Sequence, residues 1–252
     1  MSGHSKWATT KHRKAAQDKK RGALFSKLSR MITVAAKTGG DSNPENNAAL
    51  AAAIAKAKSY SLPKDKIEIA INKAFSAGAD AAAYEEVVYE GYGPAGVALY
   101  IEALTDNRNR TAADVRAAFT RAGGNLGATG SVAFQFERRG EITVERIADL
   151  DEDGLLLLVA EAGGEDLEAG DEAVLVYTAP GDVMAVKSAL ESAGVPVKGA
   201  ELVMEPMTTT TVSVADATKV LRLVDRLEEL DDIQNVYHTM ELTDEIAEAL
   251  EA

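Results

Sequence analysis

Residues 85–104 read EEVVYEGYGPAGVALYIEAL, and this stretch decides the fold class. The β-branched and aromatic residues at 87–90 and again at 97–104 predict two strands. The glycine-rich segment 91–96 between them predicts a tight turn. Its three glycines also match the G-x-G-x-x-G pattern of dinucleotide-binding loops, but that function requires a helix directly after the glycines. A strand follows here, so we interpret the segment as a hairpin turn.

The sequence before this stretch has the period of helices. Apolar residues recur at helical spacing after Arg21, and the Gly39-Gly40 pair ends that pattern. Asn43 and Pro44 are typical of a second helix start. Pro63 opens a third helix, which a glycine closes. Residues 21–79 are therefore expected to form a small helical domain, with helices over 21–39, 44–58 and 63–78.

Short strands and short helices alternate beyond residue 104. Thr111 predicts the N-cap of a helix that ends at Ala122, with Asp114 at the capping-box position. The other predicted strands are 132–136, 141–144, 173–177, 197–204, 208–214 and 233–238, and the other predicted helices are 151–162, 182–193 and 216–230. This order indicates an α+β fold with small antiparallel sheets rather than one large parallel sheet.

Two arrangements of domains fit these elements. The body could be two consecutive α+β domains, or residues 134–206 could be a domain inserted into a split one made of 80–133 and 207–240. The element count favours the split, because two strand–helix–strand units complete a four-stranded, two-helix layer. Residues 241–252 are expected to form a C-terminal tail helix.

Charge is divided unevenly along the chain. The formal net charge of the 252 residues is −13, yet residues 1–75 hold 15 Lys and Arg against 5 Asp and Glu. Residues 76–252 hold 12 against 35. This division indicates a basic region that meets a polyanion, joined to an acidic body. Residues 1–20 show no sustained apolar period, so we expect a basic arm that is flexible or ordered only on contact.

The arm also places an aromatic ring among its cations. Trp7, the only tryptophan, lies between Lys6 and Lys11, a combination suited to phosphate contact with base stacking. The alternative is that Trp7 packs on the helical domain and the lysines form a solvated tail. We favour nucleic acid. The predicted contact residues lie in the arm and at the beginning of the first predicted helix. They are Lys6, Trp7, Lys11, His12, Arg13, Lys14, Lys19, Lys20 and Arg21.

The segment 105–111, TDNRNRT, is a second candidate contact. Arg108 and Arg110 stand beside a predicted helix start, where guanidinium groups and free backbone N–H groups suit a phosphate or carboxylate. The alternative is that Asp106 and a neighbouring acid pair with the arginines and only fix the loop. The glycine-rich loop 123–130 contains G-x-x-G matches, but it runs from helix to strand. We interpret it as a flexible loop or a helix C-cap rather than a nucleotide clamp.

Residues suited to catalysis or metal binding are scarce. The chain has no cysteine, which excludes disulfides, thiolate zinc sites and cysteine nucleophiles. His4 and His12 lack further ligands nearby, and His238 ends a predicted strand, where a structural role is favoured. The acids near the hairpin, Glu90 among them, are expected to be solvated, because no nucleophile or general-acid partner accompanies them.

Other motifs of enzymes are missing as well. The chain has neither a serine elbow nor a phosphate loop, and no apolar run is long enough to cross a bilayer. We therefore expect a non-enzymatic protein without cofactor or metal.

Several motifs together resemble the YebC/PmpR family. They are MSGHSKWA at 1–8 with KHRK at 11–14, LPKD at 62–65, YEGYGP at 89–94, TDNRNRT at 105–111, and GGNLG at 123–127 with GSV at 130–132. Two positions depart from the family pattern. Ala95 stands where a glycine is usual, and Glu45-Asn46-Asn47 replaces a basic residue and a leucine, which removes positive charge from the helical domain.

The resemblance implies a cytoplasmic protein with a helical first domain and two α+β domains, the third inserted in the second. Family members are described as probable DNA-binding transcriptional regulators. Relatives, including the mitochondrial translational activator of cytochrome c oxidase, act on translation, and some bacterial members resemble ribosome-associated factors that relieve stalling on proline-rich stretches. Phosphate contact cannot distinguish DNA from ribosomal or transfer RNA.

An acidic protein-binding scaffold, with the basic arm docked on the acidic body, is the rival class. The sequence leaves the oligomeric state open, with a monomer favoured, and no membrane association is expected.

Overall fold

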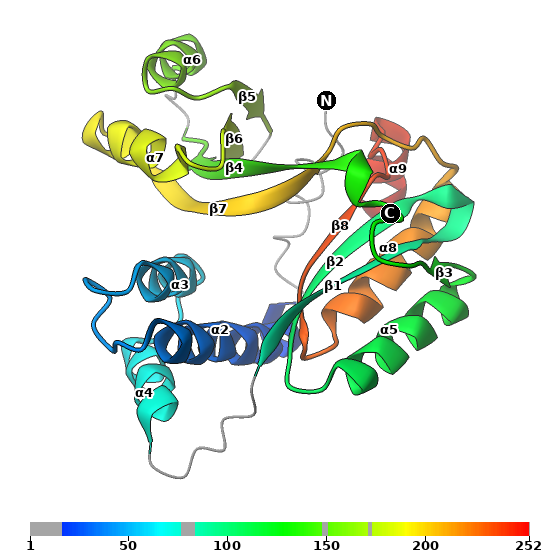
Figure 1. The fold of residues 1–252 in the computed structure, drawn as a ribbon. Coiled ribbons are helices and arrows are strands. Elements are labelled where there is room, and N and C mark those ends of the chain that lie inside the picture. Colours follow the sequence, from blue (N-terminus) through cyan, green and yellow to red (C-terminus); the bar gives the residue numbers. More distant parts are fainter. Residues whose placement is uncertain (1–16, 77–83, 148–150, 171–172, 252) are drawn as a thin grey trace. The chain divides into compact units, whose positions relative to one another are not determined.

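The computed structural model describes residues 17–76, 84–147, 151–170 and 173–251 (Figure 1). Within these residues, three N-terminal helices precede two four-stranded sheets, each with two helices. Antiparallel pairing joins the strands in both sheets. The predicted α+β class is therefore confirmed. In the described part of the chain, no helix is both long and apolar enough to span a membrane.

The helical domain consists of α2 (Gln17–Gly39), α3 (Ala48–Ser59) and α4 (Lys64–Phe75). Their apolar faces enclose a small core; its buried residues include Leu28, Ile32, Leu50 and Ile67. Helix α2 begins at Gln17 rather than at Arg21 as predicted, because long unbranched side chains such as glutamine and lysine support a helix.

The start of α3 corrects a prediction. The N-cap is Asn47, not Asn43, and the helix begins at Ala48 rather than at Pro44. The Asn47 side chain accepts a hydrogen bond from the Leu50 amide at 3.0 Å and donates one to the Ala35 carbonyl at 2.9 Å. A buried amide that satisfies both α3 and α2 outweighs the local start signal.

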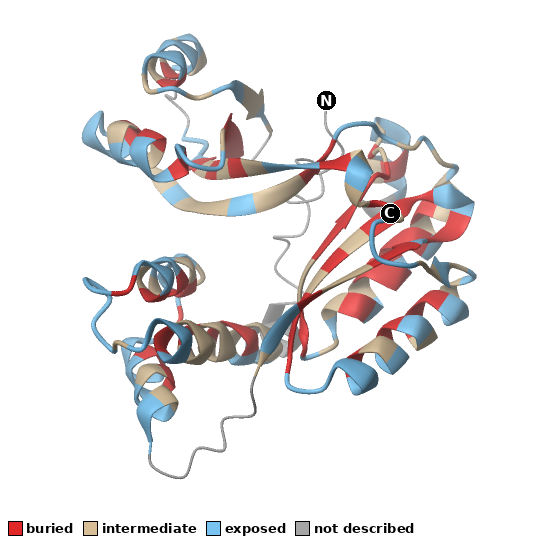
Figure 2. Ribbon diagram, viewed as in Figure 1, coloured by how far each residue is buried: buried red, intermediate tan, exposed pale blue. Residues whose placement is uncertain are grey.

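The first sheet combines segments that lie far apart in the sequence. Its strand order is β3-β1-β2-β8, so the strand near the C-terminus lies beside one from the first half of the body. The strands are β1 (Glu85–Tyr92), β2 (Ala98–Thr105), β3 (Asn125–Leu126) and β8 (Ile233–His238), and the helices are α5 (Arg108–Ala122) and α8 (Val214–Glu228). Figure 2 shows the buried residues concentrated on these strands and on the helix faces turned toward them. The split of the first α+β domain stays a prediction.

The turn between β1 and β2 is a hairpin, as predicted. A single 3-10 turn, η1 (Pro94–Gly96), connects the strands, and the Gly93 amide donates to the Val97 carbonyl at 2.8 Å. Gly91 is needed for packing, because a methyl group there would lie 2.8 Å from Phe119 Cε1 of α5. The strand after the turn leaves no helix terminus for a pyrophosphate.

The second sheet has the order β5-β6-β4-β7 and contains β4 (Phe136–Glu145), β5 (Asp166–Ala169), β6 (Ala173–Thr178) and β7 (Val197–Pro206). Helices α6 (Glu152–Glu161) and α7 (Val183–Ser192) supply one side of its core. Ile142, Val176 and Leu190 are fully buried there. Period-2 alternation on β4 therefore turns its apolar side chains toward the helices.

Two strand predictions were wrong, and one strand was missed. Residues 208–214 form no strand; Thr210 makes one isolated bridge to Met240 before α8 begins, and the tail forms α9 (Asp244–Glu251). Residues 133–135 are a 3-10 turn, η2, and 136–145 are one strand rather than two. Strand β5 was missed because DLEA has weak strand propensity; it pairs with β6, the next strand along the chain.

Candidate nucleic-acid interface

The predicted contact residues fall into three groups. Those of the arm, Lys6, Trp7, Lys11, His12, Arg13 and Lys14, lie outside the described residues. Lys19, Lys20 and Arg21 belong to the beginning of α2. Arg108 and Arg110 lie together in the first turn of α5, directly after β2, and the contacts of this pair are well defined.

Helix α5 begins earlier than predicted. Its N-cap is Asn107, whose side-chain oxygen accepts a hydrogen bond from the Arg110 amide at 3.1 Å. Thr111 is not the cap, and Asp114 is not at a capping-box position. The Thr111 side chain is instead buried, and its hydroxyl donates to Asp232 Oδ2 at 2.7 Å. Because Thr111 bonds to Asp232 in the fold, Asn107 rather than Thr111 is the N-cap of α5.

Asp232 is the centre of the polar contacts around α5. Arg110 Nη2 lies 2.8 Å from Asp232 Oδ2 and 2.7 Å from Asp106 Oδ1. The other carboxylate oxygen, Oδ1 of Asp232, accepts a hydrogen bond from Arg30 Nη1 of α2 at 2.9 Å. Thr105 at the end of β2 donates at 3.2 Å. Asp232 is only 8% exposed, so its charge is compensated almost entirely by protein groups.

These contacts shift the protonation equilibria in opposite directions. Burial alone would raise the pKa of the Asp232 carboxyl, but the hydrogen bonds from Arg110 and Thr111 outweigh it, and the pKa is lowered. The hydrogen bonds to Asp232 and then Asp106 raise the pKa of Arg110 above its usual value. The ion pair therefore persists throughout the neutral range.

The geometry favours the structural alternative for Arg110, whose guanidinium and amide both have partners inside the protein. Arg108 is less constrained. Its side chain is 64% exposed and its Nη1 lies 3.7 Å from Glu85 Oε2, a distance at which an exposed ion pair contributes little. A role in ligand contact for either arginine stays a prediction.

Two basic residues of α2 also have internal partners that the charge count could not reveal. Lys27 Nζ donates to the Glu228 carbonyl, and Arg30 donates to the Asp231 carbonyl at 2.9 Å in addition to Asp232. The Arg30 guanidinium also lies over the Tyr84 ring, 5.3 Å from its centroid. Part of the positive charge of residues 1–75 thus holds α2 against the loop before β8.

Glu90 organises the glycine-rich loop 123–130. Its buried carboxylate accepts hydrogen bonds from the amides of Gly130 at 2.6 Å and Val132 at 2.7 Å. Its carbonyl accepts from Gly127 at 2.7 Å. Gly123 has φ +78 and ends α5, which confirms the helix C-cap interpretation. The expectation that Glu90 is a solvated acid was wrong, because backbone N–H groups replace its water.

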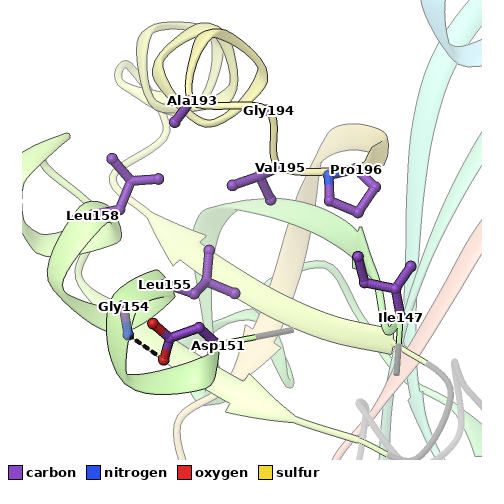
Figure 3. A pocket seen from close by; sticks show the side chains of 9 residues that line it. All are labelled: Ile147, Asp151, Gly154, Leu155, Leu158, Ala193, Gly194, Val195 and Pro196. Carbon is purple, nitrogen blue, oxygen red and sulfur yellow. Dashed lines mark hydrogen bonds between the residues drawn. The ribbon is translucent and has the colours of Figure 1, made fainter. Parts of the chain in front are cut away.

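A shallow pocket lies in the second α+β layer (Figure 3). Its lining is mainly apolar: Ile147, Leu155, Leu158, Val195 and Pro196, with Gly154, Ala193 and Gly194. Its one carboxylate, Asp151, accepts the Gly154 amide at 3.0 Å as the N-cap of α6. This arrangement offers an acid engaged in capping and no nucleophile beside it.

Histidine and acidic residues form no recognisable metal centre in the described ranges, since no three of them gather in a group that could hold an ion. His238 is fully buried at the end of β8, as expected for a structural histidine that ends a strand. His4 and His12 lie outside the described residues.

A helical domain followed by two small α+β sheets, the first completed by a strand from beyond the second, defines a distinct class of protein. Family models match the same segments. Residues 5–77 match the TACO1/YebC protein N-terminal domain, and residues 84–240 match the TACO1/YebC second and third domain. The chain therefore belongs to the TACO1/YebC family, which confirms the resemblance seen in its motifs.

Similar proteins cover almost the whole chain. A probable transcriptional regulatory protein of Rubrobacter xylanophilus is 50% identical over 246 residues, 98% of each chain. One of Enterococcus faecalis is 52% identical over 242 residues, 96% of this chain and 99% of the relative. The crystal structure of a conserved hypothetical protein from Aquifex aeolicus matches with a TM-score of 0.83 at 45% identity, covering 94% of this chain and 96% of that one.

Proposed function

We propose that this protein is a non-enzymatic regulator of gene expression that binds nucleic acid through its basic N-terminal region. The observation that carries the proposal is the charge division: residues 1–75 are basic in a chain of net charge −13. Lysine and arginine clusters neutralise phosphates and release counterions, which favours binding to a polyanion. The names of the bacterial relatives, probable transcriptional regulatory proteins, support a regulatory role.

DNA is the first candidate target, because the relatives are named for transcription. The acidic body argues for a local footprint, since residues 76–252 hold 35 acids against 12 cations and would repel a long duplex. A translational role, with contact to ribosomal or transfer RNA, is the second candidate. It is favoured by that same repulsion, because a short or structured RNA segment can meet the basic region without lying along the acidic body.

Crosslinking in cells followed by sequencing of the bound nucleic acid tests both targets. Enrichment of promoter DNA supports transcriptional control, and enrichment of ribosomal or transfer RNA supports translation. Recovery of neither above the level of an untagged control would contradict the proposal. In that outcome the protein-binding scaffold becomes the better description.

A further inference from the structure

At least half of the basic residues of the acidic body have a carboxylate partner. Of the 12 Lys and Arg in residues 76–252, six form ion pairs with acids in the described part of the chain. The pairs are Arg108–Glu85, Arg110–Asp106 and Asp232, Arg139–Glu165, Arg146–Glu152, Lys187–Glu191 and Lys198–Glu145. Because acids are so numerous in this part of the chain, an arginine without an ion-pair partner there indicates a surface that could contact an external anion.

Four unpaired arginines lie on two helices of the first sheet. They are Arg116 and Arg121 of α5 and Arg222 and Arg226 of α8. All four are exposed, and their guanidinium groups make no ion pair or hydrogen bond with other described residues. Arg138 of β4 is also exposed and unpaired, but it stands alone in the other sheet.

The two helices cover the same face of the sheet. A methyl group at Gly91 would meet Phe119 of α5 at 2.8 Å, and one at Gly93 would meet Leu223 of α8 at 3.4 Å. Positions two residues apart on an extended chain point to the same side. Both helices therefore pack on one side of β1, and both lie along this sheet in Figure 1.

On these helices the acidic and basic residues differ in exposure to solvent. In α8 the three acids, Asp216, Asp225 and Glu228, are all partly buried, whereas the three cations, Lys219, Arg222 and Arg226, are all exposed. Arg222 and Arg226 are one helical turn apart and lie opposite the buried stripe that contains Val220 and Val224. Helix α5 carries four arginines and a single acid, Asp114. The solvent side of this two-helix layer is thus basic although the body is acidic.

We infer that the outer surface of α5 and α8 is a second docking surface for the phosphates of a bound nucleic acid. Arginine presents planar pairs of donors that match phosphate oxygens, and an exposed unpaired guanidinium is available without breaking an internal contact. Each helix has 15 residues and is about 22 Å long, enough to follow several nucleotides. The inference rests on the proposed function and places a second anchor outside the arm.

A charge-neutralising variant tests this surface. It combines Arg116→Gln, Arg121→Gln, Arg222→Gln and Arg226→Gln. A matched control removes the same number of charges from the other sheet with Arg138→Gln, Arg146→Gln, Lys187→Gln and Lys198→Gln. Binding of a fluorescent RNA oligonucleotide and of a DNA duplex is measured by anisotropy over a series of salt concentrations.

The expected result is weaker binding by the α5/α8 variant than by the control. The slope of log K against log salt should fall by about one for each phosphate that the variant no longer neutralises. An Arg→Lys version of the same four positions should retain most of the salt slope. Equal affinity and slope in the variant and the control would overturn the inference.

The outcomes separate this inference from the proposed function. If the unmodified protein binds neither probe, both fail; if it binds and the variant equals the control, only the second surface fails. Thermal melting verifies that the variants fold. If the four-residue variant has a lower melting temperature, a double variant with Arg116→Gln and Arg222→Gln replaces it. A change in self-association, measured by sedimentation, with unchanged nucleic-acid binding would assign the surface to contact with a second copy of this acidic chain and would also overturn the inference.

Discussion

At Asp232, side chains from three elements meet one carboxylate. Arg30 comes from α2, Thr105 from the end of β2, and Arg110 and Thr111 from the first turn of α5. The loop before β8 therefore holds the helical domain and the first sheet at one point. Burying this carboxylate costs desolvation free energy. Removing its charge would cost more, because the cations that it neutralises would be left without a counter-ion.

Replacing Asp232 with asparagine should lower the free energy of unfolding by about 2–4 kcal/mol, because Arg30 and Arg110 lose their shared counter-ion. Urea denaturation measures the change. Asp106→Asn is the matched control, since it removes an exposed partner of the same arginine and should cost less than about 1 kcal/mol. Equal costs for the two variants would contradict the central role of Asp232.

The same residue predicts a pH dependence. The pKa of Asp232 is lowered in the folded protein, so its contribution to stability is fully present above the pKa of an unfolded aspartate, about 3.9. That contribution is lost as pH falls through the lower folded value. Urea denaturation from neutral to acidic pH should therefore show the advantage of the unmodified protein over Asp232→Asn shrinking below about pH 4. A constant difference across this range would refute the assignment.

At the scale of elements, α5 shows how a helix start is chosen. Asn107 and Thr111 are both good N-cap residues, and periodicity alone does not decide between them. Burial of Thr111 against Asp232 moves the cap to Asn107, which places Arg108 and Arg110 inside the first turn. The two arginines thereby become part of a helix terminus that is already capped.

Asn107→Ala should destabilise the protein by about 1 kcal/mol, because the Arg110 amide loses its acceptor. The change is measured by thermal melting. Asn109→Ala serves as the control, since Asn109 is exposed in the same turn and its change should stay within about 0.5 kcal/mol. A larger effect at Asn109 would show that the cap is assigned wrongly.

At the scale of the whole molecule, the uneven charge separates two models for the basic arm. In one the arm binds nucleic acid, and in the other it docks on the acidic body. Residues 1–16 precede α2, so their removal leaves the helical core residues in place. The deletion therefore tests the arm without cutting a described helix.

Deletion of residues 1–16 should weaken binding to RNA and DNA oligonucleotides and flatten its salt dependence, with little change in the melting temperature. Anisotropy titrations and thermal melting give the two measurements on the same samples. A large fall in melting temperature with unchanged binding would instead support the docked-arm scaffold.

Local sequence signals determined the elements whose cause is local. The glycine-rich turn 91–96 between two β-rich runs predicted a hairpin that the structure contains. The apolar stripe of α2 and the glycine that ends α5 were also predictable, because side-chain periodicity and a positive φ at glycine act within a few residues. The charge division and the family motifs are likewise properties of the sequence alone.

Tertiary structure decided what depends on distant partners. The caps Asn47 and Asn107, the buried role of Glu90 and the pairing of Arg110 with Asp232 depend on contacts between different elements of the fold. The unpaired arginines of α5 and α8 belong to the same group. A sequence shows how many charges a chain carries, but only the fold places each charge beside a partner or leaves it facing water.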